Sequence, residues 1–273
     1  MTAYAKMLFF VNKPALDNKV AFSNNCPNGT DQSYVIGCYH SGDRGIFLLN
    51  VTDQRLNGIV PVTAAYEMLH AGYARLSATE RTKIDRQMWS YYLSNVKSSE
   101  IHQQMASYAL TEPGAKYDEL YSVLATEVSN LPSTLNDQYK QYFTNRTKIV
   151  SMYQGYQAAF SKRQIIIDMD NSLLNSLKVK IASNETLLNS MYAQIIKDQS
   201  VLNQEKANND INSYNSGVYA YNTSANKYNA LISLTKSDII KYNRLAEYRN
   251  SLVLIEQQLI RDLNTSNLPS KVK

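Results

Sequence analysis

The sequence predicts two parts: an α+β N-terminal half over residues 1–150 and an all-α antiparallel coiled-coil hairpin over residues 151–273. Two observations lead to this division. Five of the six prolines precede residue 133, and the window between Pro132 and Pro269 therefore tolerates helix almost throughout. Apolar residues of the second half also recur every seven residues, which is typical of a coiled coil. A chain of 273 residues is long enough for two cores.

The first half contains both strand-like and helix-like segments. Residues 32–37 and 45–51 are apolar and flanked by turn residues, which predicts two strands. Thr63 is a good N-cap for a helix over residues 63–76. Ser77 and Glu80 form a capping-box pattern that opens a second helix. A further helix is expected over residues 117–129.

Two seams of apolar and tyrosine residues run through the second half. The phase of the seven-residue repeat shifts between Leu202 and Ile211, so we place the turn of the hairpin within residues 203–210. The alternative is one long helix paired with a second subunit, and coiled-coil self-association is expected in that case. The seam positions are Ile167, Leu174, Leu177, Ile181, Leu188, Met191, Ile195 and Leu202, followed by Ile211, Tyr214, Val218, Tyr221, Ala225, Tyr228, Ile232, Thr235, Ile239, Tyr242, Ala246 and Val253.

The chain has only two cysteines, Cys26 and Cys38, on either side of a turn-rich segment. Two cysteines that close a short loop predict a disulfide, which forms in oxidising compartments. We therefore expect an extracytoplasmic protein of the cell envelope, or a secreted one. The alternative is a cytosolic protein with two reduced thiols.

Charge and hydropathy narrow the expected partners. The sequence contains no run of about 18 apolar residues, and residues 1–11 are too short and mixed for a signal peptide. Membrane tethering is therefore expected only through a segment absent from this chain. The net charge of +5 comes from basic residues scattered through the second half. We expect no nucleic-acid binding, because such binding uses clustered basic residues.

The most informative motif is VTAAYEMLHAGYARL at residues 62–76. Zincins carry H-E-x-x-H on a helix, where two histidines bind Zn²⁺ and the glutamate activates a metal-bound water. Glu67 and His70 match the last two of these functional positions, and Tyr66 replaces the first histidine. Whether that replacement silences a metal site is the central functional question.

With residues 120–131 behind it, this motif resembles an exported bacterial zincin-like metallopeptidase of the gluzincin type with an appended coiled coil. The resemblance covers residues 30–150 and implies a zincin-like fold for the first half. By that resemblance His70 is a zinc ligand, Glu67 the general base and Glu127 the third ligand. The first ligand position maps to Tyr66.

Two departures from the family pattern bear on activity. A phenol is a poor zinc ligand near neutral pH because its pKa is about 10. Leu131 also stands where many gluzincins carry an aspartate one turn past the glutamate. We therefore expect weak zinc binding and poor or absent peptide cleavage. The residues that could substitute for the lost ligand are Glu119, His40 and His102.

Three functions remain open on the sequence. The first is a working or impaired peptidase acting on a peptide or protein substrate. The second is a non-enzymatic relative that binds or scaffolds partners, and the third is a structural coiled-coil protein with an N-terminal cap. Tyr66 favours the second over the first, and the polar set of Glu67, His70 and Glu127 favours it over the third.

Overall fold

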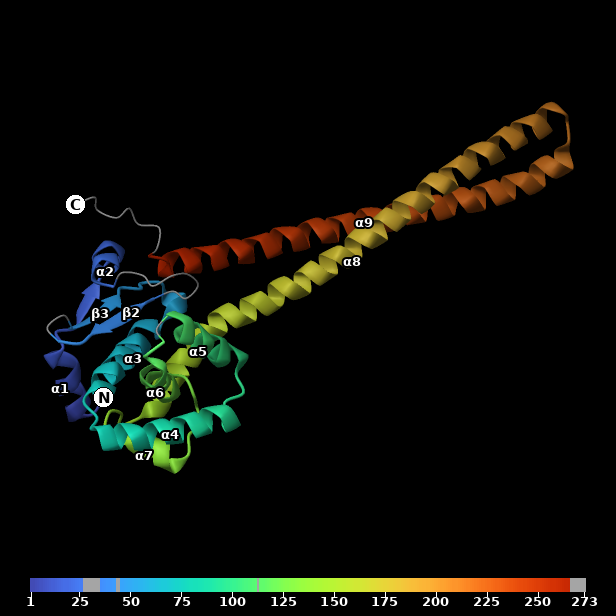
Figure 1. The fold of residues 1–273 in the computed structure, drawn as a ribbon. Helices are drawn as coiled ribbons and strands as arrows, with labels where there is room; N and C mark the ends of the chain where they lie inside the picture. Colours follow the sequence, from blue (N-terminus) through green and yellow to red (C-terminus); the bar gives the residue numbers. More distant parts are fainter. Residues whose placement is uncertain (27–34, 43–44, 112, 266–273) are drawn as a thin grey trace. The chain divides into compact units, whose positions relative to one another are not determined.

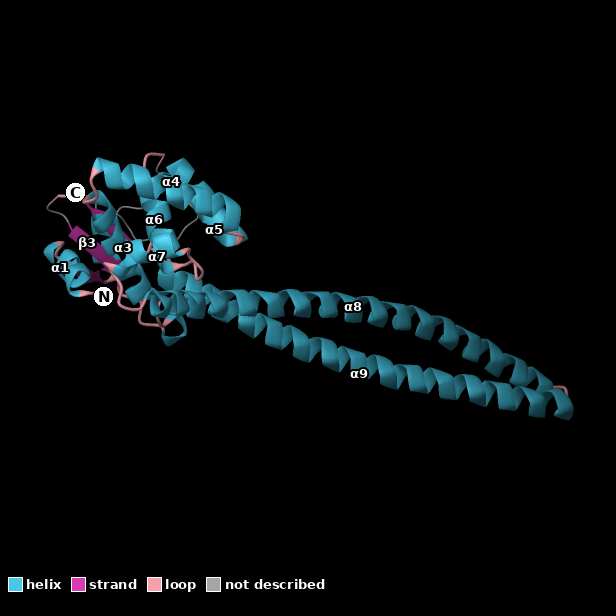
Figure 2. Cartoon of the chain, turned by 90° about the horizontal axis from the view of Figure 1, so that it is seen from below, coloured by secondary structure: helices cyan, strands magenta, loops and turns pink. Residues whose placement is uncertain are grey.

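The computed structural model describes residues 1–26, 35–42, 45–111 and 113–265 (Figure 1). Its β1 (Ala15–Asp17), β2 (Gly37–His40) and β3 (Gly45–Leu49) form a small mixed sheet in the order β1-β3-β2. β1 runs parallel to β3, and β2 runs antiparallel to it. Figure 2 shows these strands in magenta among helices. The described first half is thus α+β, as expected, although the structure does not by itself test the zincin-like fold.

The first predicted strand is displaced along the chain. The prediction covered residues 32–37, of which 32–34 lie outside the described residues, and the observed strand is Gly37–His40. Tyr39 and His40 extend the ladder because they pair with Ile46 and Gly45 of β3. The second predicted strand, over residues 45–51, corresponds to Gly45–Leu49.

The helix that carries the motif, α3 (Ile59–Ala74), begins four residues earlier than predicted. Gly58 is its N-cap in the left-handed conformation, which places Pro61 in the first turn. Proline is tolerated there because the first-turn N–H groups have no helical partner. Thr63 is therefore not the cap, and its hydroxyl donates to the Ile59 carbonyl at 2.9 Å.

Two helices of the first half, α1 (Ala3–Val11) and α6 (Lys116–Thr126), pack against α3, and others pack against α6. The packing of α3 against α6 fills the main core, where Met68, Leu69 and Leu124 are fully buried. The predicted capping box is confirmed, since Ser77 and Glu80 bond reciprocally at the start of α4. The helices are α1 (Ala3–Val11), α2 (Lys19–Asn25), the 3-10 turn η1 (Gln54–Leu56), α4 (Ala78–Asn95), α5 (Ser99–Thr111), α6 (Lys116–Thr126) and α7 (Ser133–Lys140).

Two long helices, α8 (Arg146–Ala207) and α9 (Ile211–Leu263), make up the second half (Figure 1). The turn at residues 208–210 lies within the predicted window. Lys180 pairs with Asp238 at 2.8 Å, and nearer the turn the Tyr192 and Tyr228 rings lie 6.2 Å apart. Residue numbers therefore rise along one helix as they fall along the other, which makes the pair antiparallel.

Two predicted seam positions need correction. Ile239 is 38% exposed, whereas its neighbour Asp238 is 2% exposed. A straight helix drifts relative to a seven-residue repeat, so the buried stripe moves across neighbouring positions over several turns. Ile211, the first seam residue of α9, is likewise exposed.

The chain divides into two compact units. The first unit comprises Met1–Ser161 together with the end of α9 from Gln257 onward, and the second unit is Lys162–Glu256. The end of α9 belongs to the first unit because Leu259 and Leu263 are buried with Leu56 and Ile59. Across the described ranges, none of the helices is long and apolar enough to span a bilayer.

Candidate functional site

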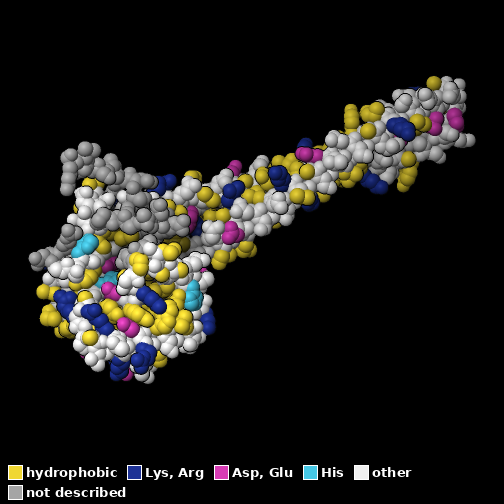
Figure 3. Space-filling view, viewed as in Figure 1, with side chains coloured by type: hydrophobic (Ala, Val, Ile, Leu, Met, Phe, Trp, Pro, Cys, Tyr) yellow, Lys and Arg dark blue, Asp and Glu magenta, His cyan; other side chains and the backbone are white. Residues whose placement is uncertain are grey.

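A cleft of about 460 Å³ in the first unit is lined by α3, α5, α6 and β2. The residues of α3 that line it follow helical spacing, so one face of the helix presents the whole motif. Acidic and histidine side chains lie beside one another on the face of this unit seen in Figure 3. The cleft therefore brings together Tyr66, Glu67, His70 and Glu127, the residues that the sequence singled out.

The Tyr66 side chain joins α3 to α6. Its hydroxyl donates to Glu119 Oε2 at 2.5 Å and lies 3.3 Å from the Tyr108 hydroxyl of α5. The Ser122 hydroxyl also donates to the Tyr66 carbonyl, at 3.2 Å, which holds the two helices together at this point. Burial, and then the neighbouring Tyr108 and Glu119, raise the pKa of Tyr66 well above its usual value. The phenol is therefore a proton donor in this site.

The His70 ring lies between two carboxylates of α6. Its Nδ1 is 2.8 Å from Asp118 Oδ1, and its Nε2 is 3.6 Å from Glu119 Oε1. Burial lowers the pKa of His70, but the Asp118 hydrogen bond and the charges of Glu119, Asp118 and Glu67 outweigh burial and raise it to about 10. The ring is accordingly an imidazolium at neutral pH, and both its nitrogens carry protons.

Glu127 lies at the end of α6 and lines the same cleft. Gln104 donates to its Oε1 at 3.1 Å. Burial raises the pKa of Glu127 to about 7, against the lowering effect of hydrogen bonds from Gln104 and Tyr153. Arg146 fixes the turn around Glu127, because its guanidinium donates to the carbonyls of Leu124, Ala125, Val128 and Ser129.

Glu67 is held against β2. A Cβ at Gly37 would lie 2.8 Å from Glu67 Oε1 and 2.4 Å from Thr63 Cγ2, so only glycine allows this approach of the strand to the helix. Glu67 is 6% exposed. Its proposed role as a general base remains a prediction.

The other two histidines lie in different surroundings. His102 Nε2 donates to the Val96 carbonyl at 2.9 Å, and the Tyr92 hydroxyl donates to His102 Nδ1 at 2.7 Å. Both ring nitrogens are thus used in a structural network outside the cleft lining. His40 lines the cleft from β2, beside the confirmed Cys26–Cys38 disulfide.

The described side chains around His70 do not form a complete zinc ligand set. The Tyr66 and Glu119 oxygens are 2.5 Å apart, closer than the roughly 3.3 Å that separates two oxygens bound to one tetrahedral zinc. His70 Nδ1 is bonded to Asp118 Oδ1 at 2.8 Å, so the ring has one nitrogen, Nε2, left to offer a metal. In the described part of the chain, the one group of three or more ligand atoms that lie within 4.8 Å of one another is Cys26, Cys38 and His40, whose sulfurs are bonded together.

Several site residues escaped the sequence prediction. Asp118, Gln104 and Tyr108 were not singled out, and Glu119 was named only as a substitute ligand. The adjacent acidic pair in the first turn of a predicted helix was the available signal for Asp118. Gln104 and Tyr108 carry the weaker signal of a four-residue spacing on α5.

Comparison of this chain with protein-family models, with curated proteins and with solved structures finds no match. We therefore infer the function from the geometry of the cleft.

Proposed function

We propose that the first unit is a metal-independent binding module with a zincin-like ancestry, and that it binds a cationic group of a peptide or protein partner in the cleft. The observation that carries the proposal is the Tyr66–Glu119 hydrogen bond at 2.5 Å. Tyr66 occupies the position where a zincin has its first histidine ligand, and this bond engages Glu119, one of the residues that could substitute for that ligand.

The chemistry of the cleft favours a positively charged ligand. Its described lining contains four acidic side chains and four tyrosines but neither lysine nor arginine, and the positive charge of His70 offsets only part of this negative charge. Carboxylates pair with ammonium or guanidinium groups, and tyrosine rings attract cations through their faces. The volume of about 460 Å³ accommodates a side chain or a peptide end. The lining residues that carry this argument are Glu67, Asp118, Glu119, Glu127, Tyr39, Tyr66, Tyr108 and Tyr156.

The Cys26–Cys38 disulfide supports the proposal of an extracytoplasmic setting, because oxidising compartments are where such bonds persist. We also propose that the hairpin contacts partner chains, self-association included. Met169, Val179 and Tyr219 are each more than half exposed on the hairpin. Figure 3 shows hydrophobic side chains along its surface.

Binding is tested with fluorescently labelled peptides that differ only in one Lys or Arg replaced by Gln. We expect the cationic peptides to bind, and to bind more weakly at high salt. Glu67→Gln should weaken the binding of cationic peptides about tenfold. The control is Asp137→Asn, which changes an exposed acidic residue outside the cleft and should leave binding unchanged. Equal binding of neutral and cationic peptides would contradict the proposal.

The metal-independent character is tested by zinc stoichiometry and peptide hydrolysis, with Tyr66→His as the comparison. We expect the natural chain with its disulfide intact to bind zinc weakly and to cleave peptides poorly or not at all. Tyr66→His should gain zinc, because it recreates two imidazoles one turn apart. Stoichiometric zinc and chelator-sensitive hydrolysis in the natural chain would show an active peptidase instead. A Tyr66→His variant that gains no zinc would count against zincin ancestry.

A further inference from the structure

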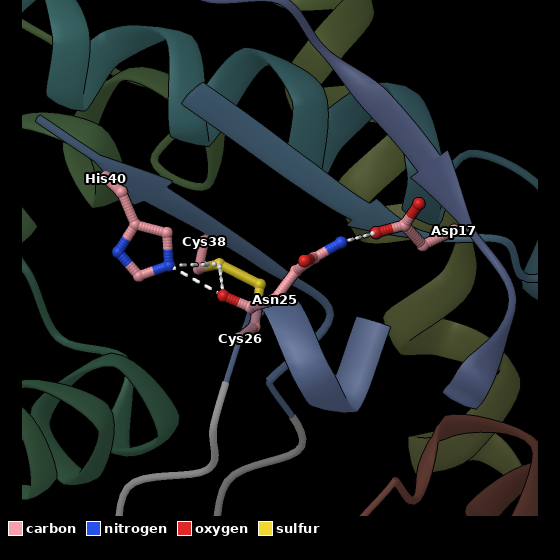
Figure 4. Close-up of a disulfide and its surroundings, with 5 residues drawn as sticks. All are labelled: Asp17, Asn25, Cys26, Cys38 and His40. Atoms are coloured by element: carbon pink, nitrogen blue, oxygen red, sulfur yellow. Dashed lines mark hydrogen bonds between the residues drawn. A yellow bond between two sulfur atoms is a disulfide. The ribbon is translucent and has the colours of Figure 1, made fainter. Parts of the chain in front are cut away.

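The Cys26–Cys38 disulfide and His40 bring three potential metal-ligand atoms together. One ligand atom from each residue lies within 4.8 Å of the others. His40 Nε2 is 3.3 Å from Cys38 Sγ, and Figure 4 shows the imidazole directed at the disulfide. This group is separate from the Tyr66–Glu119 and His70–Asp118 pairs, although it lines the same cleft.

The backbone holds these three residues in place through bonds other than the disulfide. Cys38 and His40 are two residues apart on β2, so their side chains share one face of the strand. Both residues pair with β3, opposite Phe47 and Gly45. Cys26 is the C-cap of α2, and its N–H donates to the Phe22 carbonyl.

A second anchor ties α2 to the sheet next to Cys26. The Asn25 side chain donates to Asp17 of β1 at 2.7 Å (Figure 4). Because α2 is joined to β1 and β2 is joined to β3, opening the disulfide leaves both cysteines facing each other. Their Cα atoms are 6.0 Å apart.

We propose that Cys26, Cys38 and His40 form a zinc-binding site when their disulfide is reduced. Zinc is bound by thiolates at about 2.3 Å and by imidazole at about 2.0 Å, and two cysteines with one histidine are an established ligand combination for it. The two sulfurs then lie roughly 4 Å apart, which cysteines at this Cα separation reach by side-chain rotation. Because all three residues line the cleft, water or a ligand atom from the cleft would complete the tetrahedron.

The chemistry balances with a dithiol as the reductant. The dithiol supplies two electrons and two protons to the Cys26–Cys38 bond and becomes a disulfide itself. The two protein thiols then release two protons as Zn²⁺ binds. His40 Nε2 at present donates to the Asn25 carbonyl at 2.8 Å, so its proton moves to Nδ1 when Nε2 binds the ion. The oxidised form offers only the imidazole, which makes zinc affinity dependent on redox state.

The experiment compares the full chain before and after treatment with dithiothreitol, which is removed by anaerobic gel filtration before Zn²⁺ is added. Zinc is titrated against a chromogenic chelator, and Co²⁺ serves as a spectroscopic probe of thiolate ligation. We expect one equivalent of zinc to bind on reduction, and a thiolate-to-cobalt charge-transfer band to appear. Near-ultraviolet circular dichroism records whether the reduced chain keeps its tertiary structure.

Matched variants separate this site from other zinc binding. His40→Gln should weaken zinc binding by the reduced chain at least about tenfold, and Cys38→Ser should remove the charge-transfer band. His102→Gln, which changes a histidine outside the cleft lining, should bind zinc as the natural chain does. A reduced chain that takes up no zinc, folded or unfolded, would overturn the proposal. So would equal uptake by oxidised and reduced chains, or unchanged affinity in His40→Gln.

Discussion

The hydroxyl of one residue, Tyr66, changes what the cleft can do. A histidine at this position would offer a neutral nitrogen to a metal, whereas the phenol donates a proton to Glu119. His70 lies beside the same carboxylate, and its hydrogen bond to Asp118 together with the charges of Glu119 and Glu67 raises the pKa of the ring. The side chains of α3 and α6 therefore form an internal network of hydrogen bonds and charges.

The raised pKa of Glu127 predicts how the stability of the first unit changes with pH. Burial raises its pKa from an ordinary value of 4.5 to about 7, so between these values the folded chain binds a proton that the unfolded chain has released. Its contribution to stability is fully present below pH 4.5 and is lost as pH rises through 7. Glu127→Gln should remove this loss and stabilise the first unit at pH 8 by on the order of 3 kcal/mol.

The measurement is denaturant unfolding between pH 4 and pH 8, followed by the fluorescence of Trp89. This is the chain's only tryptophan and lies in α4 of the first unit. Asp137→Asn, on the surface, is the control and should keep the pH dependence of the natural chain. An unchanged pH profile in Glu127→Gln would show that Glu127 is not the group responsible.

At the scale of elements, the contact between β2 and α3 sets the width of the cleft. Gly37→Ala would put a methyl group 2.4 Å from Thr63 Cγ2 and 2.8 Å from Glu67 Oε1. Overpacking of this kind costs about 1–3 kcal/mol. We expect that loss in denaturant unfolding monitored at Trp89, together with weaker peptide binding. Gly114→Ala is the matched control, since a Cβ there has no described neighbour within 4 Å. An equal effect of the two substitutions would contradict the close-approach argument.

Two adjacent leucines of the helical hairpin, one buried and one exposed, test where its seam lies. Leu174 is 6% exposed in the seam and Leu173 is 52% exposed beside it. Leu174→Ala should destabilise the hairpin by about 2–3 kcal/mol, because it leaves a cavity, and Leu173→Ala should stay within about 0.5 kcal/mol. Thermal melting followed by far-ultraviolet circular dichroism measures both. Similar melting of the two variants would mean that the seam is not where the structure places it.

At the scale of the whole molecule, the disulfide makes the free energy of unfolding depend on whether the surroundings are oxidising or reducing. Joining Cys26 to Cys38 constrains the unfolded chain over a short loop, a contribution of about 2–3 kcal/mol. The double variant Cys26→Ala/Cys38→Ala should lose that amount in unfolding at Trp89. The natural chain should resist thiol labelling until it is reduced. Full labelling of the unreduced natural chain would contradict the disulfide.

The elements predicted from sequence were those set by local patterns. The Ser77–Glu80 capping box and the turn of the hairpin follow from short-range rules, and both were placed correctly. α3 begins before the predicted residue 63, because its first turn accommodates Pro61, which the sequence pattern places outside the helix. The three-residue strand β1 was not predicted, since so short a segment carries no measurable alternation.

The sequence by itself determined which residues of α3 would share a face, because 3.6-residue periodicity places Tyr66, Glu67 and His70 on neighbouring turns. It also determined the disulfide, since the chain holds only two cysteines. Only the tertiary structure decided which carboxylates meet His70. The crossing of α3 and α6 brings Asp118 and Glu119 to the ring, and leaves Glu127 with Gln104 from α5. That choice depends on the relative rotation of packed helices, which residue spacing along the chain does not encode.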